Sequence, residues 1–153
     1  MPANVLIDHL RLARAEGVGP VTFRRLLARY GTPARALEAL PELSRVGGRA
    51  APPRVPSAAE AGREFDALRA LGGQFLILGQ PGYSPLLALL DDAPPLVAAL
   101  GDVAVLSARA VALVGGRNAS ANGQRMAGNL AEELARAGMV VVSGLARGID
   151  AAA

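Results

Sequence analysis

The sequence predicts an α/β protein in which a small helical domain precedes the first part of a parallel β-sheet. Residues 5–41 carry apolar residues at helical spacing, separated by glycine and proline turns. Residues 111–142 follow the order strand, helix, strand, and both strands are continuously apolar. Such strands are typical of parallel sheets that are covered on both faces. A complete sheet needs further strands, so we expect the chain to hold only part of it.

Three helices are expected in the N-terminal part. The first covers residues 5–13 and is ended by Gly17. The second spans residues 20–30 and begins with proline, which suits the first position of a helix. Thr32 caps a third helix, which we expect to end near Pro41.

The next segment, residues 44–56, has no helical or strand period and is interpreted as a linker. We therefore expect a helical domain at 1–43 and the sheet domain, cut short, at 57–153. The turn between the first two helices has the form of a helix-hairpin-helix, with exposed amides that would suit a DNA phosphate. Its candidate contacts are Gly17, Gly19, Arg24 and Arg25. An ordinary pair of helices joined by a glycine turn would show the same pattern.

In the sheet domain, Ser57 opens a capping box and predicts a helix over residues 58–71. Residues 75–78 and 96–100 are expected as short strands, with a short helical turn at 86–90 between them.

The last elements form the parallel unit. They are a strand at 111–114, a helix over 121–137 that is capped by Ser120, a strand at 140–142, and the first turn of another helix at 148–151.

Composition excludes several classes of function. The chain has no cysteine and one histidine, so a metal site is not expected. No segment has the roughly 18–20 uninterrupted apolar residues of a membrane span, and the N-terminus lacks a signal-peptide pattern. We expect a cytoplasmic protein with no membrane contact.

The positive charge is concentrated at one end of the chain. Residues 1–56 carry nine arginines against four acids, whereas residues 57–153 carry seven against nine. A basic N-terminal part suggests an acidic partner such as nucleic acid. Basic, solvated helices are also common, and the absence of lysine is explained by a G+C-rich coding sequence.

Two glycine-rich loops follow the parallel strands, at 115–120 and 143–150. Ligands of open α/β sheets bind at this edge, where glycines expose backbone N–H groups and Arg117 adds a forked cation. We therefore predict an anion site, best suited to phosphate. Its candidate residues are Gly115, Gly116, Arg117, Asn118, Ser120, Ser143, Gly144 and Arg147.

An alternative is that the glycines only allow tight turns and the arginines are solvated. The loops contain neither G-x-G-x-x-G at the first turn nor G-x-x-x-x-G-K-[ST], so neither dinucleotide binding of the usual kind nor P-loop hydrolysis is supported.

Two sequence motifs resemble those of the DprA/Smf family. V-A-L-V-G-G-R-N-A-S at 111–120 and V-V-S-G-L-A-R-G-I-D-A-A-A at 141–153 are similar to its V-G-[ST]-R and S-G-x-A-x-G-I-D. The turn at 81–85 and the segments 94–96 and 101–102 also resemble the family's approach to the sheet.

This resemblance implies an extended Rossmann fold, preceded by a helical domain that is similar to a sterile alpha motif. It further implies a non-enzymatic protein, without a cofactor, that binds and protects single-stranded DNA in natural transformation and loads the RecA recombinase. A homodimer is implied for the full-length protein. Arg117 would hold a DNA phosphate, whereas Gly116 replaces the family's Ser or Thr and Arg147 lies at a variable position of the motif.

Two other functions remain open at this point. A nucleotide-processing enzyme of the LOG type, a phosphoribohydrolase, also binds phosphate at glycine-rich loops. Its P-G-G-x-G-T loop and catalytic glutamate are not found in these residues. The third alternative is a protein-interaction module whose helical domain binds no DNA.

Overall fold

The computed structural model describes residues 3–48 and 51–153 and has the α/β organisation that the sequence predicts. The chain forms two compact units, Met1–Val103 and Ala104–Ala153.

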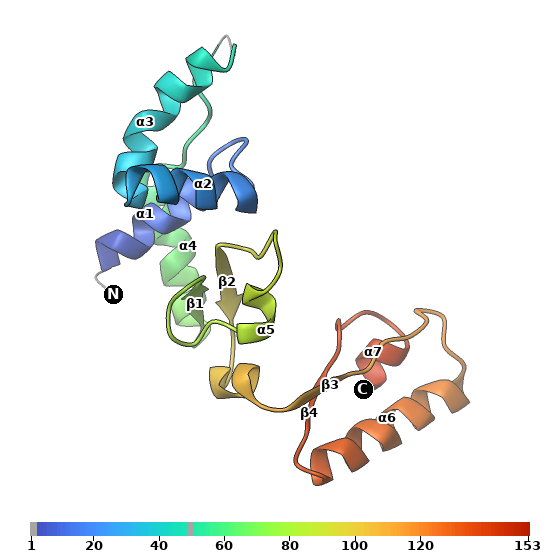
Figure 1. The fold of residues 1–153 in the computed structure, drawn as a ribbon. Coiled ribbons are helices and arrows are strands. Elements are labelled where there is room, and N and C mark those ends of the chain that lie inside the picture. The colour runs from blue at the N-terminus through green and yellow to red at the C-terminus, as the bar shows by residue number, and fades with distance from the viewer. Residues whose placement is uncertain (1–2, 49–50) are drawn as a thin grey trace. The chain divides into compact units, whose positions relative to one another are not determined.

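The helices of the first unit pack around α1 (Figure 1). They are α1 (Ala3–Ala13), α2 (Pro20–Tyr30), α3 (Pro33–Val46) and α4 (Ala58–Ala70). Leu10 and Leu12 of α1 are completely buried, and Phe23 and Leu26 of α2 are buried in the same core. The apolar stripes expected from the sequence therefore form the interior of this unit.

Side-chain caps begin two of these helices as predicted. The Thr32 hydroxyl accepts a hydrogen bond from Arg35 N at 3.3 Å. At α4, Ser57 and Glu60 form a reciprocal capping box, with N···O distances of 2.8 and 3.1 Å. The N–H of Ser57 holds the pKa of the Glu60 carboxyl below its ordinary value, because the hydrogen bond favours the ionised form.

The predicted end of the third helix near Pro41 is wrong, since α3 continues to Val46. Proline loses one backbone hydrogen bond inside a helix. In α3 this loss is offset by apolar contacts, because Leu40 is buried in the core and Leu43 packs against it. The first three residues of the predicted linker are therefore helical, and residues 49–50 lie outside the described part of the chain.

The rest of the predicted linker is tied to the turn between α1 and α2. Glu16 N donates to Arg54 O at 2.9 Å, and Arg54 N donates to Glu16 Oε2 at 3.2 Å. Helix α4 also packs against α1. Packing is thus continuous from the helices into the segment that follows them, and the domain limits at 43 and 57 stay predictions.

A short antiparallel pair completes the first unit. β1 (Gln74–Ile77) pairs with β2 (Leu96–Ala99), and Ile77 lies opposite Leu96. Both of these side chains belong to the same core as the helices. The connection between the strands contains α5 (Pro85–Ala88).

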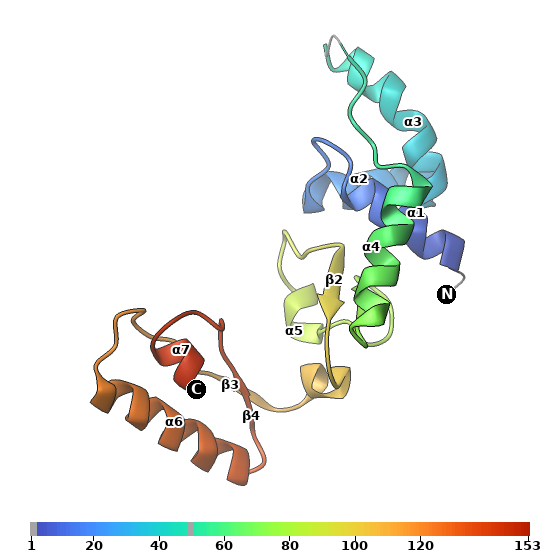
Figure 2. The same ribbon diagram turned by 180° about the vertical axis from the view of Figure 1, so that it is seen from behind.

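The second unit contains the predicted parallel strands. β3 (Ala110–Ala112) pairs with β4 (Val140–Val142) in parallel, following a short 3₁₀ helix, η1 (Val103–Ser107), that the sequence did not predict. Helix α6 (Ala121–Arg136) connects the strands and packs against β4 and against α7 (Ile149–Ala152), as Figure 2 shows from the opposite side. The predicted strand, helix, strand order is confirmed.

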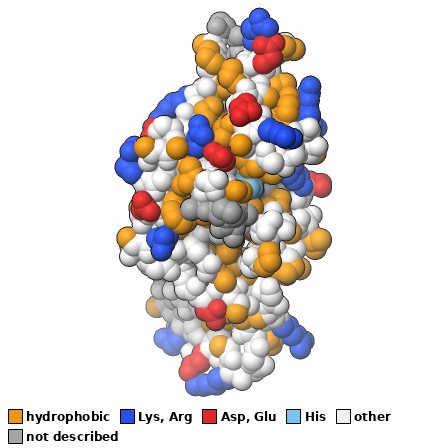
Figure 3. Space-filling view, turned by 90° about the vertical axis from the view of Figure 1, so that its left-hand side faces the viewer, with side chains coloured by type: hydrophobic (Ala, Val, Ile, Leu, Met, Phe, Trp, Pro, Cys, Tyr) orange, Lys and Arg blue, Asp and Glu red, His pale blue; other side chains and the backbone are white. Residues whose placement is uncertain are grey.

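Surface charges of both signs are interspersed on the face shown in Figure 3, where the histidine side chain lies among hydrophobic ones. This histidine, His9, is 8% exposed, and its Nδ1 lies 2.8 Å from Val5 O. None of the helices in residues 3–48 and 51–153 is long and apolar enough to cross a membrane.

The core of the first unit predicts a clear contrast between two leucines. Leu10→Ala should destabilise this unit by about 2–5 kcal/mol, because it leaves a cavity at a completely buried position. Leu86→Ala, at a side chain that is 71% exposed, is the matched control and should change stability by less than about 0.5 kcal/mol. Both tyrosines lie in this unit, so urea unfolding followed by tyrosine fluorescence measures the difference. Equal effects of the two substitutions would show that the core is assigned wrongly.

Tyr83 predicts a dependence of stability on pH. Its hydroxyl donates to Pro94 O at 2.7 Å, and burial raises its pKa above the ordinary value of 10.0. The folded chain therefore favours the neutral phenol, and this stabilisation is present below the unfolded pKa and lost as pH rises through the folded pKa. The original chain should be more stable than Tyr83→Phe by about 1 kcal/mol at neutral pH. This difference should shrink above about pH 10 in urea unfolding, and a constant difference would contradict the assignment.

Candidate nucleic-acid interface

The parallel pairing of β3 and β4 brings two loops to the same edge of the sheet. We call residues 113–120 the first loop and residues 143–148 the second loop. Leu113 N donates to Val142 O at 2.9 Å, and the Ser143 hydroxyl donates to Leu113 O at 2.8 Å. Ile149 N, just after the second loop, donates to Gly116 O at 3.3 Å. The predicted proximity of the two loops is confirmed.

A single carboxylate connects these loops. Asp150 lies in the first turn of α7 and is half-buried. Its Oδ1 accepts a hydrogen bond from Gly115 N at 3.2 Å, and its Oδ2 accepts one from Gly144 N at 3.1 Å. Two of the N–H groups that we expected to face a phosphate are therefore occupied by an anion of the chain itself.

Asp150 is not among the candidate site residues predicted from the sequence. An acidic residue in the first turn of a helix is common and only suggests a favourable interaction with the helix dipole. Nothing in the spacing indicates that both carboxylate oxygens reach backwards to the ends of two different strands. One feature of the sequence could have indicated this role. Asp150 directly follows Gly148 and Ile149, which pack against the first loop.

Three glycines of the loops are required by close packing. A Cβ atom at Gly115 would lie 2.5 Å from Cγ1 of Ile149, and one at Gly144 would lie 2.7 Å from Oδ2 of Asp150. Gly148 has a φ of +87°, and a Cβ there would collide with the backbone carbonyl of Gly116. These glycines allow the loops to pack together, as the alternative explanation of the glycine pattern proposes.

Gly116 differs from the other loop glycines. A Cβ at this position would have no atom within 4 Å, and no positive φ demands glycine here. A serine or threonine, which the resembling family carries at this position, would therefore fit. The absence of that hydroxyl changes the chemistry of the loop and leaves its backbone unaffected.

Several hydrogen-bonding groups of the two loops remain available to a ligand. Arg117 and Arg147 are exposed, and neither forms a hydrogen bond or ion pair with any other residue that the structure describes. Within the described residues, the N–H groups of Gly116, Arg117 and Asn118 also have no acceptor. Three successive unpaired N–H groups beside an arginine are well suited to an anion.

The two serine side chains are already used within the fold. The Ser120 hydroxyl caps α6 by accepting a hydrogen bond from Gly123 N at 3.1 Å, and Ser143 holds Leu113 O. Ser120 retains a hydroxyl hydrogen that can be donated to a ligand.

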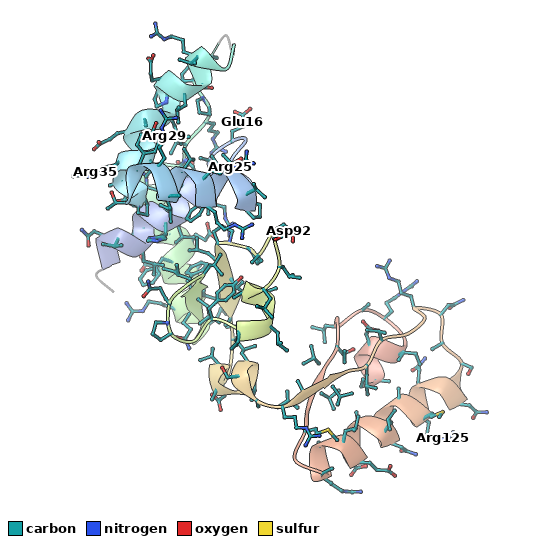
Figure 4. The ribbon with its side chains drawn as sticks, viewed as in Figure 1. Glu16, Arg25, Arg29, Arg35, Asp92 and Arg125 are labelled. Carbon is teal, nitrogen blue, oxygen red and sulfur yellow. The ribbon has the colours of Figure 1, made fainter. Side chains whose placement is uncertain are left out.

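The candidate contacts of the hairpin lie in the other unit. Gly17 has a φ of +76°, Gly19 precedes α2, and Arg25 is exposed whereas Arg24 is half-buried. Figure 4 shows Arg25 on α2 and Glu16 at the hairpin. DNA contact by the hairpin stays a prediction.

Removing the Asp150 carboxylate should release both loops. In Asp150→Ala, amide hydrogen exchange at Gly115 and Gly144 should accelerate by about tenfold to a hundredfold, as expected for the loss of hydrogen bonds to a charged group. Glu132→Ala is the matched control, because it removes an exposed carboxylate from the same unit. NMR-detected exchange measures each amide separately. Unchanged protection at both glycines in Asp150→Ala would refute the bridge.

Comparison with known proteins agrees with this architecture. Residues 4–67 match the family model described as the DprA-like N-terminal HHH domain, and residues 74–153 match the one described as DNA recombination-mediator protein A. The chain is 37% identical over 89 residues to the DNA processing protein DprA of Bacillus subtilis (strain 168). This alignment covers 58% of the chain and 30% of the relative.

A solved structure shares the fold. The X-ray structure of DNA processing protein A (DprA) from Streptococcus pneumoniae superimposes with a TM-score of 0.64 at 22% identity. The match covers 99% of this chain and 52% of that one, so the chain spans about half the length of its structural relative. Because the second family model covers just over half of the chain, we conclude that the protein belongs to the DNA recombination-mediator protein A family.

Proposed function

We propose that the two loops at the end of β3 and β4 bind the phosphates of single-stranded DNA. The proposal is supported mainly by the convergence of the two loops at one edge of the sheet. Together the loops carry two arginines and three N–H groups without an acceptor among the described residues. The family description, a mediator of DNA recombination, supports DNA as the ligand.

Within the proposed site, the loop residues divide into two groups. Arg117, Arg147 and the N–H groups of residues 116–118 contact phosphate oxygens, since no other described group uses them. Gly115 and Gly144 belong to the site because they set the shape of the loops, and their N–H groups stay with Asp150. The proposed contacts are mainly with the sugar–phosphate backbone, so binding should depend little on base sequence.

Family membership supports a proposal for the role of the longer protein in the cell. We propose that a protein of the relatives' length protects single strands, loads the RecA recombinase onto them in natural transformation, and acts as a cytoplasmic homodimer. The chain covers 30% of one relative and 52% of the other, so these activities are proposed for the longer protein. The family descriptions name a mediator of recombination, and the proposal assigns no catalytic residue and no cofactor.

The hairpin of the first unit is proposed as a secondary contact. Gly17, Gly19, Arg24 and Arg25 would meet the DNA backbone outside the loop site. Support comes from the family model described as an HHH domain, which covers residues 4–67.

A salt titration tests the phosphate contact of Arg117. Arg117→Ala should weaken binding to an oligothymidine strand, and the slope of log affinity against log salt concentration should flatten by about 0.7, which corresponds to one lost phosphate contact. Arg109→Ala is the matched control. Arg109 is exposed and lies just before β3, at the opposite end of the strand from the loops, and its loss changes the net charge equally.

The two variants separate a specific contact from a general effect of charge. The proposal expects a flatter slope in Arg117→Ala and the original slope in Arg109→Ala. Equal slopes in the original chain and in Arg117→Ala would exclude Arg117 from the site.

A further inference from the structure

Leu145, in the second loop, combines two unusual properties. Its φ is +53°, and no other non-glycine residue in the described ranges has a positive φ. Its side chain is also 88% exposed, more than any other large apolar side chain in the same ranges. A leucine in the left-handed region is strained, and an exposed one gains nothing from burial. Within the described residues, no contact of the Leu145 side chain compensates for this strain.

The neighbours of Leu145 hold it in this conformation. On one side, Gly144 N is hydrogen-bonded to Asp150 Oδ2 at 3.1 Å. On the other, Gly148 packs against the backbone of the first loop with a φ of +87°. The backbone on both sides of Leu145 is thus fixed by contacts other than its own. Backbone strain that is maintained in this way is concentrated at ligand-binding sites.

The loops have phosphate-binding groups and lack the usual groups for nucleobases. Proteins that bind single strands without sequence preference stack bases on aromatic rings. Residues 104–153 contain no Phe, Tyr or Trp. The most exposed large apolar residues of the two loops are Leu145 and Val114, which is 78% exposed in the first loop.

We infer that Leu145 is a nucleobase contact: its side chain packs against the bases of a single strand whose phosphates are held by Arg117 and Arg147. This inference rests on the proposed function. Leucine side chains can contact or separate stacked bases without reading their hydrogen-bonding edges. Arg117 and Arg147 on these loops favour a single strand over a second copy of this chain. A DNA strand is negatively charged, whereas the same loops of a second copy would carry the same positive charge and repel. Apolar contact would add affinity without adding sequence specificity.

The test compares strands with and without bases. Leu145→Asn removes the apolar side chain and introduces a residue type that tolerates the left-handed region. Leu145→Met is the matched control, because it keeps an apolar side chain of similar size at this position. Each variant is titrated with an oligothymidine strand and with an abasic sugar–phosphate strand of the same length. Amide exchange at Gly144 verifies that the loop keeps its hydrogen bond to Asp150.

Leu145→Asn should bind oligothymidine about threefold to tenfold more weakly than the original chain, while its affinity for the abasic strand and its salt slope stay unchanged. Leu145→Met should bind oligothymidine nearly as well as the original chain. Equal weakening on both strands would overturn the inference and reduce Leu145 to a role in loop shape. A change in oligomeric state in Leu145→Asn, without selective loss on oligothymidine, would also overturn it and indicate a second copy as the occupant.

Arg117→Ala distinguishes failure of this inference from failure of the proposed function. If Arg117→Ala weakens both strands and Leu145→Asn weakens neither, phosphate binding stands and base contact by Leu145 is refuted. If neither variant changes the affinity for either strand, the proposed site is refuted together with the inference.

Discussion

The carboxylate of Asp150 is the constraint on which the arrangement of the two loops depends. Parallel pairing alone brings the ends of β3 and β4 to the same side of the sheet, but it does not fix the loops that follow. By accepting from Gly115 N and Gly144 N, Asp150 ties both strand ends to the first turn of α7. Hydrogen bonds to a charged acceptor are stronger than those between neutral groups, so one side chain can order both loops. Gly144 is required by this bridge, because a Cβ there would collide with Asp150, whereas Gly115 is required by its close packing against Ile149.

This bridge also changes how the edge can hold a phosphate. In many α/β sheets, N–H groups of a glycine-rich loop point directly at the bound anion. Here two such groups donate to Asp150, whose negative charge opposes an anion placed at the same point. Affinity must then come from Arg117, Arg147 and the unpaired N–H groups of the first loop. Binding of this kind would depend strongly on salt and weakly on sequence, as the proposed function requires.

Local signals were sufficient to predict most elements of the fold. The caps at Thr32 and Ser57 act as predicted. The strand predicted at 111–114 is formed by Ala110–Ala112 and pairs in parallel with Val140–Val142, as expected. The end of α3 could not be predicted from Pro41, because burial of Leu40 and packing of Leu43 continue the helix past the proline. The bridge made by Asp150 could not be predicted either. It depends on the distance between two loops in space, which a pattern along the chain does not contain.

The glycines and the exposed residues of the loops therefore have separate tasks. Gly115, Gly144 and Gly148 are sterically required, and substitution at any of them disturbs the packing of one loop against the other. Glycine is not sterically required at position 116, because a side chain there would meet open space. A polar side chain at this position could therefore add a hydrogen-bonding group without disturbing the packing of the loops. Leu145 is the converse case, a bulky residue where the backbone favours glycine. Because no contact within the described residues accounts for a strained leucine that is left in solvent, this position supports the proposed contact with a ligand.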